Sequence, residues 1–428
     1  MPRIKVFYGW WIVAAGCVVW VFNSMTYGYG LSVFYKRLID DFGWSRAQLA
    51  GAISLSRLES GVLGGAEGFL VDKLGPRPIM LVGVTLMSLG FVMMSTTTSL
   101  LYFYVVIIGL VAVGESLSYL VPIDTTVANW FIKKRGTAFG FLRGSISVGA
   151  AGVALLAWFI SQYGWRTAFV ATGIGTFVLG IPASFVMRRR PEYYGLLPDG
   201  ERRQGKDNPG TSKAGGPAGS SLAETATAGA EDEADIGMTA VQALKSQAFW
   251  TISFGFAIRM MVTGAVTLHA IPLVEDMGYS KATAAAVLGL IGTVSLTGRL
   301  GGGWLCDLLG AKRVTVVSVL TLAVSCLILA FAQSLWMIVL FVAIYAPSYG
   351  SQVAAMPAIR AEHFGRRAFG AITGLSGTLQ TGGSVIGPFF AAYVYDATGS
   401  YQIAFLVFAA LSLVAAALFL TLRPPRYR

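Results

Sequence analysis

The stretch GFLVDKLGPR at residues 68–77 decides the fold, because it returns as GWLCDLLGAK at residues 303–312. Both copies carry a glycine, an aspartate and a second glycine at matching positions, and both end on a basic residue. Outside this window the matched residues pair Asp41 with Asp276, Gly43 with Gly278, Ser45 with Ser280, Phe131 with Phe364, Lys133 with Arg366 and Lys134 with Arg367. A repeat on this scale predicts two homologous halves in one chain.

The composition places both halves in a membrane. Of the 428 residues, 55% are hydrophobic and only 12% are charged, and the mean hydropathy is +0.66. Soluble domains carry roughly a quarter charged residues, so most soluble enzymes and disordered chains are excluded. A membrane helix needs about 20 apolar residues. Twelve stretches meet this need, at 8–33, 47–69, 79–97, 100–129, 137–162, 166–186, 249–272, 283–305, 314–333, 335–358, 368–393 and 401–422.

We therefore expect an all-α membrane protein with twelve transmembrane helices in two pseudo-symmetric six-helix halves, residues 1–187 and 247–428. Residues 188–246 between them are polar and rich in Gly, Ala, Ser and Thr, which predicts a flexible cytoplasmic linker. Near its end, Thr239 is placed to cap a short surface helix over residues 239–247.

The net charge of +11 orients the helices. With the N-terminus inside, nearly all loop Lys and Arg residues lie on the inner side, and the outer loops hold only Lys36, Arg37, Arg46, Arg166 and Lys281. The positive-inside rule then places both termini in the cytoplasm, and we expect the chain to lie in the plasma (inner) membrane. Because topology accounts for the basic excess, the bilayer is the expected partner and nucleic acid is not.

Residues 68–77 resemble the signature loop of the major facilitator superfamily, and residues 303–313 resemble its degenerate second copy. The resemblance covers the whole chain and implies a transporter that works by alternating access, with no enzymatic activity, metal or cofactor. It also implies that Asp72, at a helix end, pairs with an Arg of the facing half in one state. The other residues expected to act in the gate or in the conformational change are Arg77, Asp307, Glu67, Asp124 and Arg143. The alternative, that the motif only shapes a loop, would account for Gly75.

A narrower resemblance rests on YGWW at residues 8–11, on residues 130–136 and on RLGGG at residues 299–303. These look like the monocarboxylate transporter branch and its oxalate/formate antiporter relatives. That resemblance implies that Arg299 binds the substrate carboxylate. Family members often carry a proton-coupling Asp one turn earlier, where this chain has Ser295, so symport, exchange and uniport stay open. Oxalate is disfavoured, because residues 368–393 lack the second cation of the oxalate carriers.

Charged residues inside the predicted spans are functional candidates, because a charge in the bilayer is costly unless it is paired or hydrated. The first half holds both signs, whereas the second half holds two arginines and no acid except Asp307 and Asp396 at helix ends. An unpaired guanidinium offers a carboxylate two parallel donors, so Arg299 and Arg259 are predicted anion ligands. Arg259 could instead pair with a first-half acid. The charged residues within the first-half spans are Arg57, Glu59, Glu67, Glu115, Asp124 and Arg143.

Further roles follow from helical spacing. Tyr119 shares a helix face with Glu115 and could donate to the same carboxylate as Arg299, as a tyrosine does in the transporters this chain resembles. Asp124 and Arg143 lie at similar depth in antiparallel spans, which predicts an ion pair. The remaining substrate-binding candidates are Ser295, His269, Tyr349 and Arg57, and the proton-coupling candidates are Glu115, Glu59 and His269, the last being equally compatible with a neutral, hydrogen-bonded ring.

The predicted function is secondary transport of small organic anions, lactate- or pyruvate-like monocarboxylates first, with proton symport, by a monomer. The alternatives are exchange of other carboxylates and efflux of drugs or neutral solutes. A membrane enzyme or sensor is disfavoured, because the chain contains no GxSxG or GxxxxGK[ST] string and its only histidines are His269 and His363.

Overall fold

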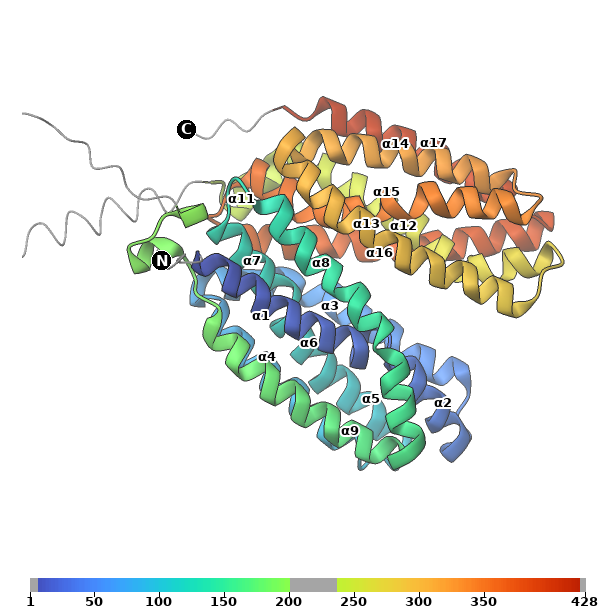
Figure 1. Cartoon of the computed structure of the whole chain (residues 1–428), viewed down its shortest axis with the longest axis horizontal. Helices are drawn as coiled ribbons and strands as arrows, with labels where there is room; N and C mark the ends of the chain where they lie inside the picture. Colours follow the sequence, from blue (N-terminus) through green and yellow to red (C-terminus); the bar gives the residue numbers. More distant parts are fainter. Residues whose placement is uncertain (1–6, 201–236, 424–428) are drawn as a thin grey trace, which may run out of the picture.

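The computed structural model describes residues 7–200 and 237–423, and this part of the chain is built of helices. Two groups of helices meet at one end and diverge toward the other (Figure 1). The first group comprises α1 (Tyr8–Asn23), η1 (Ser24–Gly28), α2 (Leu31–Phe42), α3 (Arg46–Leu74), α4 (Pro76–Met94), α5 (Leu100–Val106), η2 (Ile107–Ala112), α6 (Val113–Ser118), α7 (Leu120–Trp130), α8 (Arg135–Ala151) and α9 (Val153–Val186). The second comprises α12 (Gln247–Asp276), α13 (Lys281–Leu309), α14 (Ala311–Ala330), α15 (Leu335–Phe364), α16 (Phe369–Thr398) and α17 (Gln402–Thr421).

The twelve-helix prediction is confirmed, although the long and strongly apolar helical stretches in the described part of the chain number fewer than twelve. Among the described residues, nine helical stretches are long and apolar enough to cross a membrane. One of them, Arg135–Val186, breaks at Gly164, whose φ of 79° lies in the left-handed region that favours glycine, so it supplies two spans. The last two are α3 and α16, which are long but less apolar. They pack against each other across the boundary between the two groups.

Two spans are irregular. The first continues through the π-helix η1 into α2, and the fourth contains the π-helix η2 and a break at Tyr119. Pro122 follows that break and has no N–H to donate to the preceding turn. Single π-turns are frequent at functional positions. Here η1 interrupts the regular α-helix after α1, and η2 interrupts it before α6.

The end where the groups meet carries both copies of the repeated motif, and we call it the motif end, defined by the turns at Gly75 and Gly310. The helices touch there backbone to backbone. A Cβ added to Gly374 of α16 would lie 1.8 Å from the Gly64 oxygen of α3, and one added to Gly136 of α8 would lie 2.2 Å from the Gly303 oxygen of α13. Only glycine permits these approaches, so the motif end is tightly closed.

Gly374→Ala is therefore expected to open the motif end. The added methyl cannot coexist with the Gly64 carbonyl, and overpacking of this kind costs about 1–3 kcal/mol, which favours the open state by roughly tenfold or more. The native thiol of Cys306 reports this opening, because it is buried where α13 meets Gly136. In a protein whose Cys17 and Cys326 are replaced by alanine, we expect Gly374→Ala to speed the maleimide labelling of Cys306.

The matched control is Gly377→Ala, one turn along α16, where an added Cβ meets no atom within 4 Å. It should label at the rate of the parent protein. Equal labelling of the two variants would show that the glycine contact does not hold the motif end closed.

The region between the halves differs from the predicted flexible linker at both ends. Residues 188–200 contain the 3-10 turns η3 (Pro191–Tyr194) and η4 (Pro198–Gly200) and make specific contacts. The predicted capped helix exists as α11 (Ala240–Lys245), where Thr239 and Gln242 form a capping box. Within the predicted linker, the acidic residues Glu231, Asp232, Glu233 and Asp235 lie outside the described residues.

Candidate functional site

The centre of the second half holds two buried arginines around one tyrosine. Arg259 of α12 and Arg299 of α13 are each 3% exposed. Their guanidinium carbons lie 5.1 Å and 5.8 Å from the ring centroid of Tyr349 in α15. The ring of Tyr345 stacks on that of Tyr349 at 6.0 Å. The four side chains thus form one cationic, aromatic-lined cluster drawn from three helices.

Small residues bring these helices together. A Cβ on Gly298 would lie 2.0 Å from the Pro347 oxygen, and one on Gly350 would lie 2.1 Å from the Ser295 oxygen. The backbones of α13 and α15 are therefore in contact beside the cluster. This approach places Arg299 next to Tyr349, which hydropathy alone does not predict.

Neither arginine of the cluster has an acidic partner within the part of the chain that the structure describes. Arg299 donates from Nη1 to the carbonyl oxygen of Arg143 at 2.7 Å, across the boundary between the halves. The Nε atoms of both Arg259 and Arg299 are buried without a hydrogen-bond partner. The alternative pairing of Arg259 with Glu59 or Glu115 is not seen among the described contacts, so two guanidinium groups remain available to an anion.

Asp124 and Arg143 form the ion pair that their matched depth predicts, and both side chains are buried. Arg143 also lies over the ring of Trp20, 5.4 Å from its centroid. The backbone carbonyl of Arg143 accepts the hydrogen bond from Arg299. The ion pair therefore helps to position the first-half residue that contacts the cluster.

Arg360 is a buried cation that lies outside the predicted spans. Hydropathy ends the tenth span at residue 358, but α15 continues to Phe364 and Arg360 is only 2% exposed. Its Nη2 donates to Ser376 of α16 at 3.0 Å, and its charge interacts with that of Asp124 in the other half. A basic residue just beyond a predicted span was the available signal.

Three carboxyl groups gather in the first half. Glu115 accepts from Asn23 at 3.5 Å, Glu67 accepts from Ser116, and Glu59 accepts from Ser60 at 3.1 Å. The charges of the three acids interact with one another. One oxygen each of Glu59 and Glu67 is buried without a partner among the described residues. The acids therefore concentrate in one half and the unpaired arginines in the other.

The structure does not bring four predicted substrate ligands to the arginine cluster. The Tyr119 ring packs on Trp20 at 5.7 Å, and the Ser295 hydroxyl donates to Gly292 in its own helix at 2.7 Å. The imidazole of His269 contacts the Tyr401 hydroxyl and the Pro388 carbonyl, both at 3.1 Å. Because a carbonyl only accepts, Nε2 of His269 donates to Pro388, whereas the Tyr401 hydroxyl can either donate to Nδ1 or accept from it. Arg57 is exposed on α3.

The aspartates of the motif contact helix N-termini of the opposite half. Asp72 accepts from the backbone N–H groups of Gly370 and Ala371 in α16, at 3.0 and 2.8 Å. Asp307 accepts from those of Gly136 and Thr137 in α8, at 2.6 and 2.8 Å. The expectation that Asp72 pairs with an arginine of the facing half is wrong in this state, because the first N–H groups of a helix attract a carboxylate.

Arg77 and Glu67, which are also predicted gate residues, make their contacts within the first half. The Arg77 guanidinium lies over the ring of Phe185 in α9, 4.3 Å from its centroid. Glu67 is buried against Ser116 of α6. Their part in gating stays a prediction.

Comparison with known proteins agrees with this architecture. A sequence model of the Major Facilitator Superfamily matches residues 12–308 and 295–428. The chain is 22% identical to Monocarboxylate transporter 12-B of Danio rerio over 93% of its own length and 83% of the relative's. It is also 22% identical to Monocarboxylate transporter 2 of Homo sapiens, over 92% of this chain and 81% of that one.

Solved structures share the fold at low sequence identity. The proton:xylose symporter XylE superposes with a TM-score of 0.73 at 14% identity, and the superposition covers 97% of both chains. The human organic anion transporter MFSD10 gives a TM-score of 0.69 at 14% identity, covering 98% of this chain and all of the other.

Proposed function

The chain belongs to the Major Facilitator Superfamily, and we propose that it carries small monocarboxylates across the membrane by alternating access. It is an integral membrane transporter, not an enzyme, and its relatives include monocarboxylate transporters. The observation that carries the proposal is the pair of buried arginines at Tyr349, which have no acidic partner among the described residues.

The chemistry of the cluster favours an anion. A carboxylate that bound Arg299 would accept two parallel hydrogen bonds and would relieve the cost of a lone buried charge. Arg259, whose guanidinium also lies by the Tyr349 ring, would bind a second acceptor, such as the keto or hydroxyl oxygen of pyruvate or lactate. The substrate would then bridge α12 and α13.

Proton coupling would fall to the acids of the first half. Glu115 and Glu59 lie in the half that faces the arginines, and Glu59 has an oxygen free of partners among the described residues. His269 is a poorer carrier, because both of its ring nitrogens are already hydrogen-bonded. Symport would therefore move one proton on a first-half carboxyl with each anion, and exchange is the alternative in which no proton moves.

We also propose that the motif end faces the cytoplasm. Both ends of the described chain and helix α11 lie at this end (Figure 1). So do most basic residues of the loops, including Lys73, Lys133 and Arg313, as the positive-inside rule requires of a cytoplasmic face. The structure would then be closed toward the cytoplasm.

The test is uptake by purified protein in liposomes. We expect saturable uptake of labelled pyruvate or lactate, stimulated by an inward proton gradient, and competition by other monocarboxylates. Uptake without any response to the gradient would favour exchange over symport. Uptake of a neutral sugar or a hydrophobic drug, with none of the carboxylates, would contradict the proposal and favour the efflux alternative.

A further inference from the structure

The segment that follows α9, residues 188–200, runs across the motif end, and we call it the strap. Its last anchor on the first half is Asp199, which accepts from the backbone N–H groups of Ile132, Lys133 and Lys134 at 2.9, 2.8 and 3.2 Å. Asp199 has a φ of 59°, in the left-handed region. A carboxylate held by three consecutive N–H groups is a strong local attachment.

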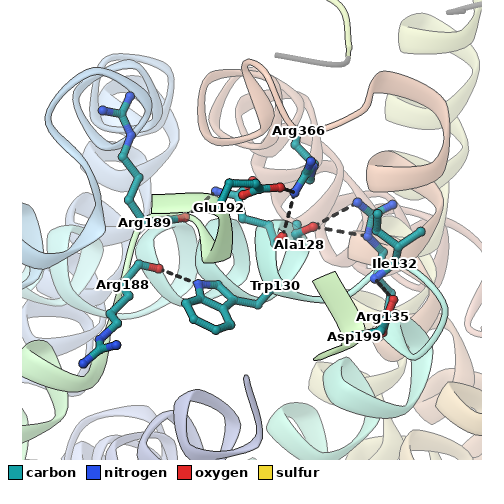
Figure 2. Close-up of polar contacts among 10 residues, drawn as sticks. Ala128, Trp130, Ile132, Arg135, Arg188, Arg189, Glu192, Asp199 and Arg366 are labelled. Atoms are coloured by element: carbon teal, nitrogen blue, oxygen red, sulfur yellow. Dashed lines mark hydrogen bonds and ion pairs between the residues drawn. The ribbon is translucent and has the colours of Figure 1, made fainter. Parts of the chain in front are cut away.

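The start of the strap is attached to the same half. Trp130 donates from Nε1 to the Arg188 carbonyl at 2.8 Å, and Asn129 donates to the Arg189 carbonyl at 3.0 Å (Figure 2). The Arg188 guanidinium lies 4.1 Å from the ring centroid of Tyr8 and 4.3 Å from that of Tyr194. The strap is therefore fixed at both of its ends to the first half.

The middle of the strap contacts the second half. Glu192 forms a 2.8 Å ion pair with Arg366, which lies in the turn between α15 and α16 (Figure 2). The two side chains are 6% and 7% exposed. Arg366 also donates to the carbonyl oxygen of Asn129 in α7 at 3.0 Å. One buried charge pair thus ties the strap to the opposite half.

The same turn holds the other end of the connecting region. Gly237 pairs with Gly365 in an antiparallel bridge, and Met238 donates its N–H to the Phe364 carbonyl at 2.9 Å. Residues 188–200 and residues 237–238 therefore both contact residues 364–366. A flexible connection of two halves does not require either contact.

We propose that the strap is a built-in brake that holds the motif end closed through Glu192 and Arg366. The proposal rests on alternating access, but not on the identity of the substrate. When the halves separate at this end, Arg366 moves away with α16 while Asp199 and Trp130 keep the strap on the first half. The ion pair must then break, so its strength is part of the barrier to opening.

The test measures opening without substrate. In the protein with Cys17 and Cys326 replaced by alanine, Glu192→Gln should raise the open fraction about tenfold or more, since the charge that compensates Arg366 in a buried pair is removed. Maleimide labelling of Cys306 would rise accordingly. Cys306 lies at the α8–α13 contact and is not bonded to Glu192 or Arg366 among the described residues, so a local loosening around Glu192 alone would leave it protected.

Asp199→Asn weakens the attachment of the strap to the first half, so the test does not depend on a single variant. Each variant alone should speed labelling, and the double variant should be no faster than the faster single one, because a strap released once has no further effect. Glu275→Gln, the same change at the opposite end of the bundle, is the matched control. Unchanged labelling in Glu192→Gln, or effects that multiply in the double variant, would overturn the proposal. Pyruvate uptake is not needed, so failure here leaves the proposed function untouched.

Discussion

Arg299→Ala is expected to lower pyruvate or lactate uptake by about 30-fold or more. Removing one partner of a buried, hydrogen-bonded charge pair costs about 2–5 kcal/mol, and the substrate carboxylate would lose its two parallel donors. Arg299→Lys keeps the charge but loses the planar fork, so intermediate uptake is expected. Initial rates in proteoliposomes, at matched protein density, measure the effect.

The same substitution should not destabilise the empty protein. Arg299 pairs with no acid among the described residues, so alanine removes a desolvated charge that no counter-charge there compensates. The melting temperature in detergent should stay level or rise, whereas stabilisation by pyruvate should disappear. Arg313→Ala, at an exposed position at the start of α14, is the control and should keep both uptake and ligand stabilisation. Undiminished uptake by Arg299→Ala would remove the anion site from the cluster.

Asp124→Asn is expected to weaken the fold more than any other single change considered. It leaves Arg143 buried without a counter-charge, and breaking a buried pair from one side costs about 3–5 kcal/mol. Arg360, whose charge also interacts with Asp124, loses that interaction as well. We expect a clearly lower melting temperature in detergent and, because Arg143 holds Arg299 through its carbonyl, weaker uptake too.

Asp396→Asn, the same substitution at an exposed position, should leave the melting temperature unchanged. Exchanging the pair, with arginine at 124 and aspartate at 143, should recover part of the loss, since both charges are again compensated. Equal melting temperatures for Asp124→Asn and Asp396→Asn would mean that the ion pair contributes little to stability.

The sequence predicts most of the fold because the repeat and the apolar stretches are independent signals. The two less apolar helices, α3 and α16, are also predicted as spans, at 47–69 and 368–393, and the motif at residues 68–77 requires a helix before it. The turn at Gly164 is visible as a gap between apolar stretches. The ordered conformation of residues 188–200 is not visible in the sequence, because composition reports only average polarity. The strap is held by a few long-range bonds from Glu192 and Asp199.

The site was less accessible from the sequence. The unpaired arginines follow from counting charges in each half, and Tyr349 could be named only as one of several tyrosines. The partners of Asp72 were misjudged, because a backbone N–H carries no signature in the sequence whereas an arginine does. Ser295 and Tyr119 were selected by helical position relative to Arg299 and Glu115, and a helix face does not say which neighbour covers it.

The backbone contacts at Gly64–Gly374 and Gly136–Gly303 bear on leakage. A seal made of side chains can admit a file of water whenever one rotamer changes, and protons can follow such a file. Here no side chain stands between the helices at these points, so no rotamer change can breach the seal there. A path for water opens only when whole helices separate, and the permeability of this end is tied to the transport cycle itself.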